Sequence, residues 1–448
     1  MGLKVGEIIM IKFLKTVLKL SAIFVFMFSF FTQCAQNEVI LSPYLSYFNF
    51  SNSSAQCVIK KHPCVLLLRT NRIWGGVSES TFNLFKKLCN LGYNVVILVP
   101  RDSRFQEELI KLKCPHYAYK GVRYWKKNFE FRNSFYRVLK LIIELEEIDI
   151  IHTQTKGELF AARVVAKNFN IGLVAQYHGS VIDDVKNFRE CDLFLGVSPL
   201  IVEYLKNDNK RALRNIRHIE FLPPFFDEEK FTHFVPPTQS RIDFFKENFN
   251  VTLKDIPTIC MVGHLYPCKN HKGILKALKI LIDKYKTEAQ IVFAGSDTDN
   301  QLKNLNLLAK TLNIEDRVFF LGFTKKIPEI LFYSDLKVLP SLRDAFPIVI
   351  LEAAMMKKPI ILSRLANAAN FFIQNQKTGL LCDPHDYDQI ARLIKEVISD
   401  KSKSKKFGEN AYALVQNNFT TRAILAKLVS LYEQIYVERK VHSEKSKL

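Results

Sequence analysis

The sequence predicts an α/β protein built from two doubly wound domains, each with a parallel sheet covered by helices. Its 448 residues are too many for one hydrophobic core of ordinary size. Short apolar runs alternate with amphipathic segments in two series, and the Pro-rich stretch FLPPFFDEEKFTHFVPPTQS (221–240) separates them as an interdomain linker would. With 48% hydrophobic and 24% charged residues, the composition excludes an intrinsically disordered chain.

The N-terminus differs from the rest of the chain. MGLKVGEIIMIKFLKTVLKL is basic, LSAIFVFMFSFF (20–31) is apolar and TQCAQ follows, an order typical of an export signal. The apolar run is shorter than the roughly 20 residues that a membrane-spanning helix needs. We therefore expect a signal-like or membrane-anchor segment over residues 1–35 and a polar spacer over 36–62. A helix lying in the membrane interface is the alternative.

The first series predicts an N-terminal domain over residues 63–235. Its apolar runs are continuous, as in strands of a parallel sheet that is buried on both faces. The expected strands are CVLLLR (64–69), NVVILVP (94–100), IDIIHTQ (148–154), LVAQYH (173–178), DLFLGVS (192–198) and HIEFLP (218–223). Helices are expected at residues 78–92, where Gly92 ends the helix, and around LFAARVVAKNF (159–169).

The second series predicts a C-terminal domain over residues 236–420. The expected strands are PTICMVG (257–263), QIVFAG (290–295), RVFFLG (317–322), DLKVLP (335–340) and KPIILS (358–363). Helices are expected at 272–285 and 300–313, and another should begin near Pro347, whose missing N–H costs nothing in a first helical turn. Successive helices should fill 385–437, with the last one packing back across the first domain. Residues 421–448 form this helix and a basic tail.

Charge and cysteine content limit the partners and the compartment. A formal net charge of +20 points to anionic partners such as nucleoside diphosphates or phospholipid headgroups. Nucleic acid has only this charge in its favour, so we expect no nucleic-acid partner. Nine cysteines without a CxxC pair indicate reduced thiols. Cys260, His264 and Cys268 recur every fourth residue, but the segment crosses from a strand into a turn, so we expect no metal site there.

Ligands of doubly wound sheets bind beyond the carboxyl ends of the strands. In NRIWGGV (71–77), Gly75 and Gly76 follow a strand, and their bare backbone can approach a ligand closely; a plain tight turn explains them equally well. His178 ends another strand, with a satisfied structural histidine as the alternative. VGHLYPCKNH (262–271) offers basic side chains near a helix N-terminus, where they can neutralise a diphosphate.

The stretch PSLRDAFPIVILE (340–352) carries a carboxylate on either side of the start of a helix. Asp344 lies in the preceding loop, and Glu352 lies more than one turn inside the helix, so both can face the space above its N-terminal end. That end carries free N–H groups and a partial positive charge that suit a phosphate. In the alternative, Asp344 only caps the helix and Glu352 lies on a solvated edge.

Together these segments resemble the retaining glycosyltransferases of the GT-B fold, specifically the family 4 group, from about residue 65 to residue 420. In the second half, VGHLYPCKN is similar to the family's V-G-R-L-x-x-x-K-G stretch, FLGF (320–323) to its base-contacting loop and DAFPIVILEAA to its E-x7-E region. NQKTGLLCDPHDYDQIARLI (375–394) is similar to its T-G-L-L strand and following helix. In the first half, IWGGVSES, DIIHTQ, QYHGS and LGVSPLI match the corresponding family segments.

The resemblance implies two Rossmann-like domains that face a cleft, with the nucleotide-sugar donor bound by the second. Glu352 would hold the ribose hydroxyls, Asp344 the transferred sugar, and free amides near Ile348 and Val349 the diphosphate. The implied catalytic residues are Lys269, His264, His178 and Asp344. The implied donor-binding residues are Gly75, Gly76, Gly263, Gly322, Phe346, Ile348, Val349 and Glu352. No cofactor and no metal are expected, because Lys269 with its partner can stabilise the departing diphosphate.

The sequence departs from the family pattern at several positions. His264 replaces an Arg, Asp344 replaces a longer Glu, and Ala345 replaces a Gly. NAANF (367–371) lacks both glycines and the acid of the family's G-G-x-P-E loop, and LPPFFD (222–227) lacks its Asn-Gly. A degenerate, non-catalytic GT-B protein that binds a sugar nucleotide or glycan therefore stays an alternative, as does a GT-B epimerase or phosphorylase.

The expected function is transfer of a hexose, with retention, from a nucleotide sugar to a glycan or lipid-linked acceptor in cell-envelope polysaccharide or glycolipid synthesis. A membrane surface is an expected partner. Four lysines precede the apolar run, which favours an inside N-terminus and exported domains. The reduced thiols and the need for nucleotide sugars favour the opposite arrangement. We expect an uncleaved segment on the inner membrane face, with the catalytic domains on the cytoplasmic side.

Overall fold

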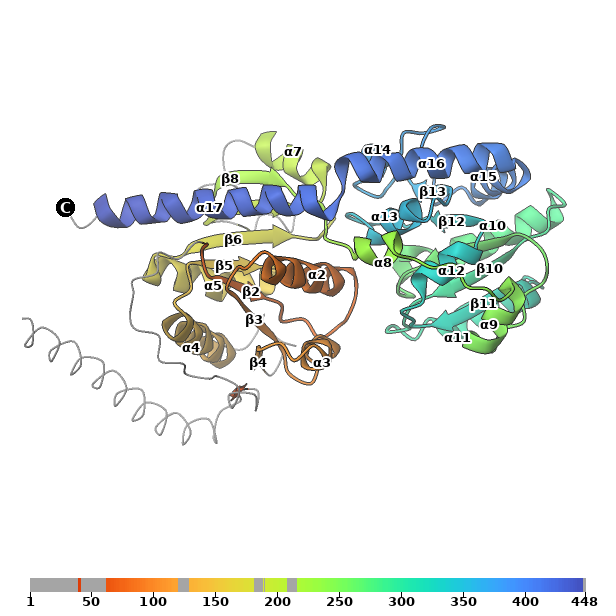
Figure 1. Cartoon of the computed structure of the whole chain (residues 1–448). Coiled ribbons are helices and arrows are strands. Elements are labelled where there is room, and N and C mark those ends of the chain that lie inside the picture. The colour runs from red at the N-terminus through yellow and green to blue at the C-terminus, as the bar shows by residue number, and fades with distance from the viewer. Residues whose placement is uncertain are drawn as a thin grey trace, which may run out of the picture.

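The computed structural model describes residues 39–41, 62–119, 129–180, 188, 190–207 and 216–445. The expected N-terminal signal-like segment lies outside this part. Among the described residues, no helix combines the length and the apolar character needed to cross a membrane. Two sheets, each covered by helices, lie side by side (Figure 1). The predicted fold class, a two-domain α/β protein, is confirmed.

The first sheet has eight strands in the order β1-β4-β3-β2-β5-β6-β7-β8, and only the pairing of β1 with β4 is antiparallel. The strands are β1 (Val39–Leu41), β2 (Val65–Leu68), β3 (Val95–Pro100), β4 (Tyr117–Tyr119), β5 (Ile150–Thr153), β6 (Gly172–Tyr177), β7 (Cys191–Gly196) and β8 (Ile216–Phe221). The helices are α2 (Gly76–Asn90), α3 (Arg104–Lys111), α4 (Phe129–Glu146), α5 (Lys156–Phe169) and α7 (Pro199–Asn207). All six strands expected from the sequence are present.

The sequence reading assigned no element to residues 101–147, where the structure has α3, β4 and α4. A local signal marks α3: the hydroxyl of Ser103 caps the helix by accepting a hydrogen bond from the backbone N–H of Gln106 at 3.3 Å. The expected helix at 78–92 begins earlier, at Gly76, and Gly92 follows its end with a φ of +81°.

The second sheet has six parallel strands in the order β11-β10-β9-β12-β13-β14. The strands are β9 (Thr258–Val262), β10 (Gln290–Ala294), β11 (Val318–Gly322), β12 (Leu336–Leu339), β13 (Ile360–Ser363) and β14 (Leu380–Cys382). The helices are α8 (Glu228–Thr232), α9 (Arg241–Phe249), α10 (His271–Asp283), α11 (Leu302–Thr311), α12 (Ile327–Tyr333), α13 (Ile348–Met355), α14 (Ala369–Phe372), α15 (Tyr387–Ser399) and α16 (Lys401–Asn418), with 3-10 turns η2 (Pro267–Lys269) and η3 (Glu315–Arg317). The strand order reverses between β9 and β12, so the loops after these strands flank the switch point where ligands bind.

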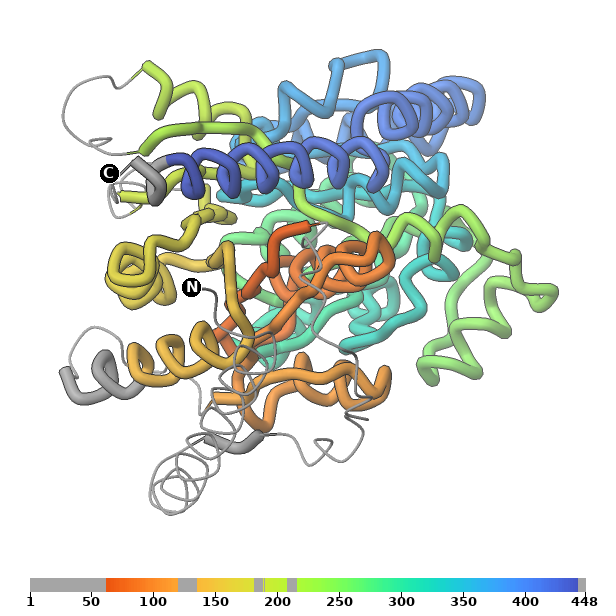
Figure 2. The backbone as a smooth tube through the Cα atoms, turned by 60° about the vertical axis from the view of Figure 1, so that its left-hand side comes forward, coloured from red at the N-terminus to blue at the C-terminus, as the bar shows by residue number. Residues whose placement is uncertain are grey.

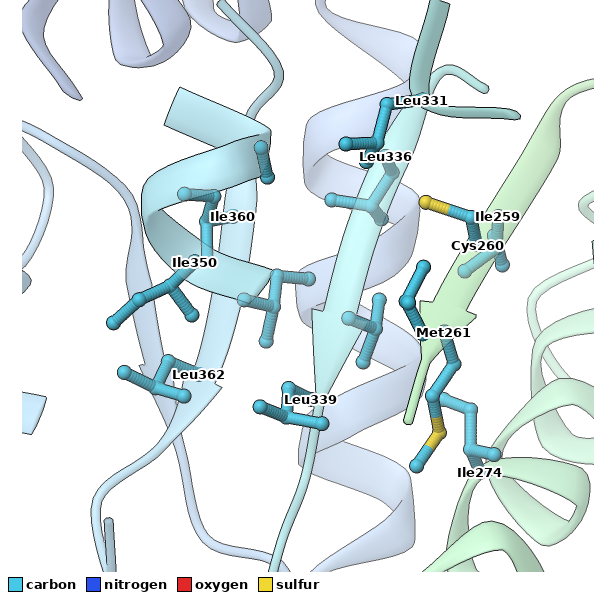
Figure 3. Packing of buried hydrophobic residues seen from close by; sticks show 14 of the residues in the cluster. Ile259, Cys260, Met261, Ile274, Leu331, Leu336, Leu339, Ile350, Ile360 and Leu362 are labelled. Atoms are coloured by element: carbon cyan, nitrogen blue, oxygen red, sulfur yellow. The ribbon is translucent and has the colours of Figure 1, made fainter. Parts of the chain in front are cut away.

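Aliphatic side chains fix α13 against this sheet. Figure 3 shows Ile350 of α13 beside Ile360 and Leu362 of β13, next to Leu336 and Leu339 of β12. All five are fully buried, and burial of each contributes about 1.5–3 kcal/mol. The start of α13 is therefore held rigidly at the switch point.

The last helix, α17 (Thr421–Lys445), returns across the first sheet, as the sequence predicted (Figures 1 and 2). Its Tyr432 hydroxyl is 2.6 Å from Nδ1 of His152 on β5, and Arg439 pairs with Asp192 of β7 at 2.8 Å. On β6, a Cβ at Gly172 would lie 2.7 Å from Ile435, so the helix needs a glycine there. The helix thus joins the two domains.

Candidate functional site

A cavity of about 410 Å³ lies between the two sheets and is lined by both. From the second domain, the lining residues include Gly263 and His264 after β9, Gly295 and Ser296 after β10, Phe323, Thr324 and Lys325 after β11, and Ile348, Val349 and Glu352 of α13. From the first domain and the linker, they include Trp74, Gly75, Gly76, Glu79, Phe82, Lys86, Glu108, Asp227 and Lys230. Seven of the twelve residues implied by the resemblance therefore meet at one cavity.

The loops after β9 and β10 pack backbone against backbone at the cavity wall. A Cβ at Gly295 would lie 1.9 Å from the carbonyl oxygen of Gly263, a distance that no side chain tolerates. Val349 and Ile348, in the first turn of α13, approach the same space. Amides of a first helical turn have no partner within their helix and suit an anion. The wall therefore presents bare backbone and free donors.

Lys269 and Asp344 form an ion pair with a distance of 2.5 Å between Nζ and Oδ2. The 3-10 turn η2 places the lysine, and the backbone N–H of Leu342 donates to the carbonyl of Cys268 at 2.8 Å, which ties the two loops together. The lysine chain passes the cavity wall, because a Cβ at Gly263 would lie 3.9 Å from its Cε. An ammonium has three N–H donors, so two remain available for a second anionic ligand.

Glu352 lines the cavity from inside α13. Burial raises its pKa to about 7; Lys230 counteracts this shift, and the carboxylate of Glu79 adds to it. The side chain is thus a carboxyl group poised between its two protonation states near neutral pH. A carboxylate in such a place binds hydroxyl donors strongly.

His264 joins the two domains at the cavity. Its Nε2 lies 2.9 Å from the position that a Cβ on Gly75 would take, so the glycine permits the close approach. Burial lowers the pKa of His264, with hydrogen bonds to the backbone of Trp74 and Ser296 acting in the opposite direction. The imidazole is therefore neutral at pH 7 and offers hydrogen bonding instead of charge.

His178 follows β6 and lies outside the cavity lining. Its Nε2 is 2.9 Å from Oε1 of Gln154, which orients the ring, and burial followed by the charge of Arg69 lowers its pKa to about 3. Asn367 connects this loop to Asp344: its side-chain amide donates to the carbonyl of Ser180 at 3.2 Å, and its backbone N–H donates to the carbonyl of Asp344 at 2.9 Å. Asn367 thus holds the two loops together, a role that its place in the divergent NAANF segment did not suggest.

Phe346 and Gly322, two further residues expected at the donor, are not among the residues that line the cavity. Phe346 is 6% exposed and packs against Phe419, with ring centroids 5.7 Å apart, so its ring belongs to the core. Gly322 ends β11 with a φ of +69°, and the following Phe323 lines the cavity. His271 is buried with a pKa lowered to about 3, mainly by burial, and is neutral.

Sequence reasoning missed the contacts that close the cavity between the domains. Lys325 donates to both carboxylate oxygens of Glu108 on α3 at 2.9 Å. The guanidinium carbon of Arg104 lies 3.6 Å from the ring centroid of Phe323. Both contacts involve α3, a helix that was not predicted from the sequence.

No group of three His, Cys, Asp or Glu side chains that could hold a metal ion occurs within the described residues. Of the residues that recur every fourth position, Cys260 is fully buried in β9, and His264 faces the first domain.

Comparison with known proteins decides the family. Residues 243–414 match the family described as Glycosyl transferases group 1, and residues 74–230 match Glycosyltransferase Family 4. The N-acetyl-alpha-D-glucosaminyl L-malate synthase of Bacillus anthracis is 36% identical over 311 residues, which are 66% of this chain and 76% of the relative. The chain belongs to the group 1 glycosyltransferases.

Other group 1 glycosyltransferases and solved structures agree with this assignment. The UDP-Gal:alpha-D-GlcNAc-diphosphoundecaprenol alpha-1,3-galactosyltransferase of Escherichia coli is 26% identical over 68% of this chain and 79% of its own length. Anabaena HepE, solved in complex with UDP and glucose, superposes with a TM-score of 0.70 at 18% identity, covering 83% of this chain and all of that chain. A Rickettsia africae glycosyltransferase gives 0.71 at 20% identity, covering 84% and 99%.

The predicted GT-B fold, enzyme class and function, hexosyl transfer from a nucleotide sugar, are confirmed by these relatives. None of the relatives or structures favours the epimerase, phosphorylase or non-catalytic alternatives.

Proposed function

We propose that this glycosyltransferase moves a hexose, with retention and without a metal ion, from a nucleoside diphosphate sugar to a lipid-linked or glycan acceptor of the cell envelope. One observation carries the proposal: the start of α13 and Glu352 line a single cavity between two doubly wound domains, and the Lys269–Asp344 pair lies behind Gly263 of the cavity wall. A nucleoside diphosphate sugar has a diphosphate between a ribose and a hexose. The site offers a matching order of groups.

The donor would lie along α13. The ribose hydroxyls would donate to Glu352, and the diphosphate would accept from the amides of Ile348 and Val349. The base would reach the loop at Phe323, whose ring gives an apolar surface for stacking. The hexose would extend toward Asp344, which lies beside the loop after β6.

In the transfer step, the bond between the anomeric carbon and the diphosphate oxygen breaks, and the acceptor oxygen bonds to the same face of the sugar. The acceptor's proton passes to the departing diphosphate oxygen. Lys269 stabilises the negative charge that develops there, since two of its N–H donors remain beyond the pair with Asp344. His178, neutral and oriented by Gln154, would contact the hexose.

The acceptor class follows from the relatives and from charge. The Escherichia coli relative is named for a diphosphoundecaprenol-linked sugar. The net charge of +20 of the present chain suits anionic lipid headgroups and diphosphates. We therefore place the acceptor at a membrane surface.

The test is a donor screen on the purified full-length protein in detergent, with UDP-, GDP- and ADP-hexoses and a bacterial lipid extract. Mass spectrometry should detect a hexosylated lipid or glycan with one donor, and NMR should give the donor's anomeric configuration in the product. Activity should survive EDTA. If no nucleoside diphosphate sugar is bound or consumed, the proposal is wrong.

We also propose that the catalytic domains lie on the cytoplasmic side of the membrane. A C-terminal alkaline phosphatase fusion in a bacterial host should be inactive, because this reporter folds only after export. A matching β-galactosidase fusion should be active. Strong phosphatase activity would place the domains outside.

A further inference from the structure

Beside Glu352, the cavity is lined by two charged side chains that no sequence pattern singled out, Glu79 and Lys230. Glu79 of α2 and Glu352 of α13 both line it, so each domain contributes one carboxylate. Lys230, from α8 in the linker between the domains, lines the same space. The two acids therefore meet at a place that exists only when both domains are present.

The two carboxylates influence each other. Burial raises the pKa of Glu352, and Glu79 adds to the shift. Burial is also the largest cause of the raised pKa of Glu79, and Lys230 is the leading cation that opposes the shift in both groups. One cation thus serves two acids, and the arrangement needs further hydrogen-bond donors when both acids are ionised.

Glu79 is held in place by neighbours on its own side. Trp74, which also lines the cavity, hydrogen-bonds to its carboxylate. About two turns further along α2, Lys86 pairs with Asp227 at 3.3 Å, and the next residue, Lys87, pairs with Glu229. Because α2 is fastened to the linker, Glu79 presents a positioned acceptor to the cavity.

We propose that Glu79 is a second ribose-binding residue, so that Glu352 and Glu79 each accept a hydrogen bond from one of the two vicinal hydroxyls of the donor nucleotide. This inference rests on the proposed use of a nucleotide-sugar donor. A ribose supplies two O–H donors to the two buried acceptors, and Lys230 balances the second negative charge. The ribose then joins the two domains, so the domains bind the nucleotide together in the closed arrangement.

Such a site should bind a ribonucleotide more tightly than the corresponding deoxyribonucleotide. A site with two carboxylate acceptors leaves one of them unpaired when a hydroxyl is missing, and loss of a hydrogen bond to a charged group weakens binding roughly tenfold or more. Contacts to the base or the diphosphate contribute equally to the affinity for the ribonucleotide and for its deoxy forms. Selectivity for ribose is therefore the readout that a merely structural Glu79 would not change.

The experiment uses calorimetric titration of the full-length protein with UDP, GDP and ADP, followed by the 2′-deoxy and 3′-deoxy forms of the nucleotide that binds. Wild type should lose roughly tenfold in affinity for each deoxy form. Glu79→Gln should bind the ribonucleotide about three- to tenfold more weakly and should discriminate against only one of the two deoxy forms. Glu352→Gln should retain discrimination against the other.

Two further variants separate position from fold. Glu107→Gln changes an exposed acid on the neighbouring helix α3 and should behave as wild type. Lys230→Gln changes an exposed lysine, so this variant should fold even if Glu79→Gln does not. It should weaken binding of the ribonucleotide more than binding of the deoxy form that leaves Glu79 unpaired.

The outcomes are distinguishable. If wild type binds none of the three diphosphates, both the proposed function and this inference are wrong. If it binds one, but Glu79→Gln and Lys230→Gln keep the full discrimination against both deoxy forms, only the inference is overturned.

Discussion

The two ends of the proposed donor site use charge in opposite ways. At the proposed hexose end, Lys269 and Asp344 form an ion pair of opposite charges 2.5 Å apart. At the ribose end, Glu79 and Glu352 carry like charges, and burial raises the pKa of both. The charges at the first end balance each other without a ligand, whereas the two like charges at the second end need additional hydrogen-bond donors.

This difference suggests that one end acts in the transfer step and the other in binding the nucleotide. An ammonium already oriented by a carboxylate can stabilise charge on a leaving group without reorganising. A pair of carboxylates with spare acceptor capacity gains most from binding hydroxyls, which suits recognition. We therefore expect changes at the hexose end to affect turnover, and changes at the ribose end to affect affinity.

The largest effect should come from Lys269→Met. Turnover should fall about 10²–10³-fold, because the leaving diphosphate loses its cation, while Tm should change little. The assay is steady-state release of nucleoside diphosphate. Lys272→Met, at an exposed lysine in the first turn of α10, is the matched control and should stay within about twofold of wild type. Equal losses in both variants would remove the distinction between the two ends.

Gly295→Ala should test whether the shared wall holds both ends in register. Its Cβ would lie 1.9 Å from the carbonyl oxygen of Gly263, so the loops after β9 and β10 must separate, at a cost of about 3 kcal/mol. Differential scanning fluorimetry should give a Tm lower by roughly 6–12 °C. Gly322→Ala, at φ +69° with open space around it, should cost less, about 1–2 kcal/mol. A Gly295→Ala protein as stable as wild type would contradict the close packing.

Donor affinity should depend on pH through Glu352. The charged groups that act on it are Glu79, Asp227, Lys230 and Lys337, and its pKa is raised to about 7. The ionised carboxylate accepts a hydrogen bond from a ribose hydroxyl more strongly than the protonated acid does, so nucleotide affinity should weaken about tenfold from pH 8 to pH 6. Glu352→Gln should bind more weakly at pH 8 and show a flatter profile. An unchanged profile in this variant would assign the titration to another group.

The raised pKa of Glu352 also makes the stability of the fold depend on pH. A carboxyl whose pKa rises on folding favours the protonated folded state, so its contribution to stability falls as pH rises from about 4.5 to about 7. The difference in Tm between Glu352→Gln and wild type should therefore be more positive at pH 8 than at pH 4.5, by a few degrees. A lower Tm at both pH values would make Glu352 a structural residue.

The smallest effect should come from His264→Arg. A permanent charge would replace a neutral imidazole near the diphosphate and should lower the donor KM about threefold, with a matching rise in turnover if the weakened diphosphate clamp limits the reaction. The measurement is a donor titration at constant pH. An unchanged or higher KM with unchanged or lower turnover would show that the longer side chain cannot fit beside Gly75.

The architecture and seven residues that line the cavity could be predicted from the amino-acid sequence. Hydrophobic periodicity is local, so the eleven expected strands and the helix starting near Pro347 could be predicted without knowing their neighbours. The same holds for Gly75, His264 and Glu352, because each follows a strand or lies in a helix at a fixed place in a doubly wound unit. The elements over 101–147 were missed although Ser103 carried a capping signal.

Which side chains contact one another depends on the packing of segments that are far apart in the sequence. Lys269 and Asp344 are 75 positions apart, and Asn367 and Ser180 are 187 apart, so no local pattern could pair them. The ring of Phe346 packs against Phe419, 73 positions further along the chain. The opposition of Glu79 and Glu352 requires two domains to face each other. Local order depends on side-chain periodicity along one segment, whereas a site between domains depends on packing that brings distant segments together.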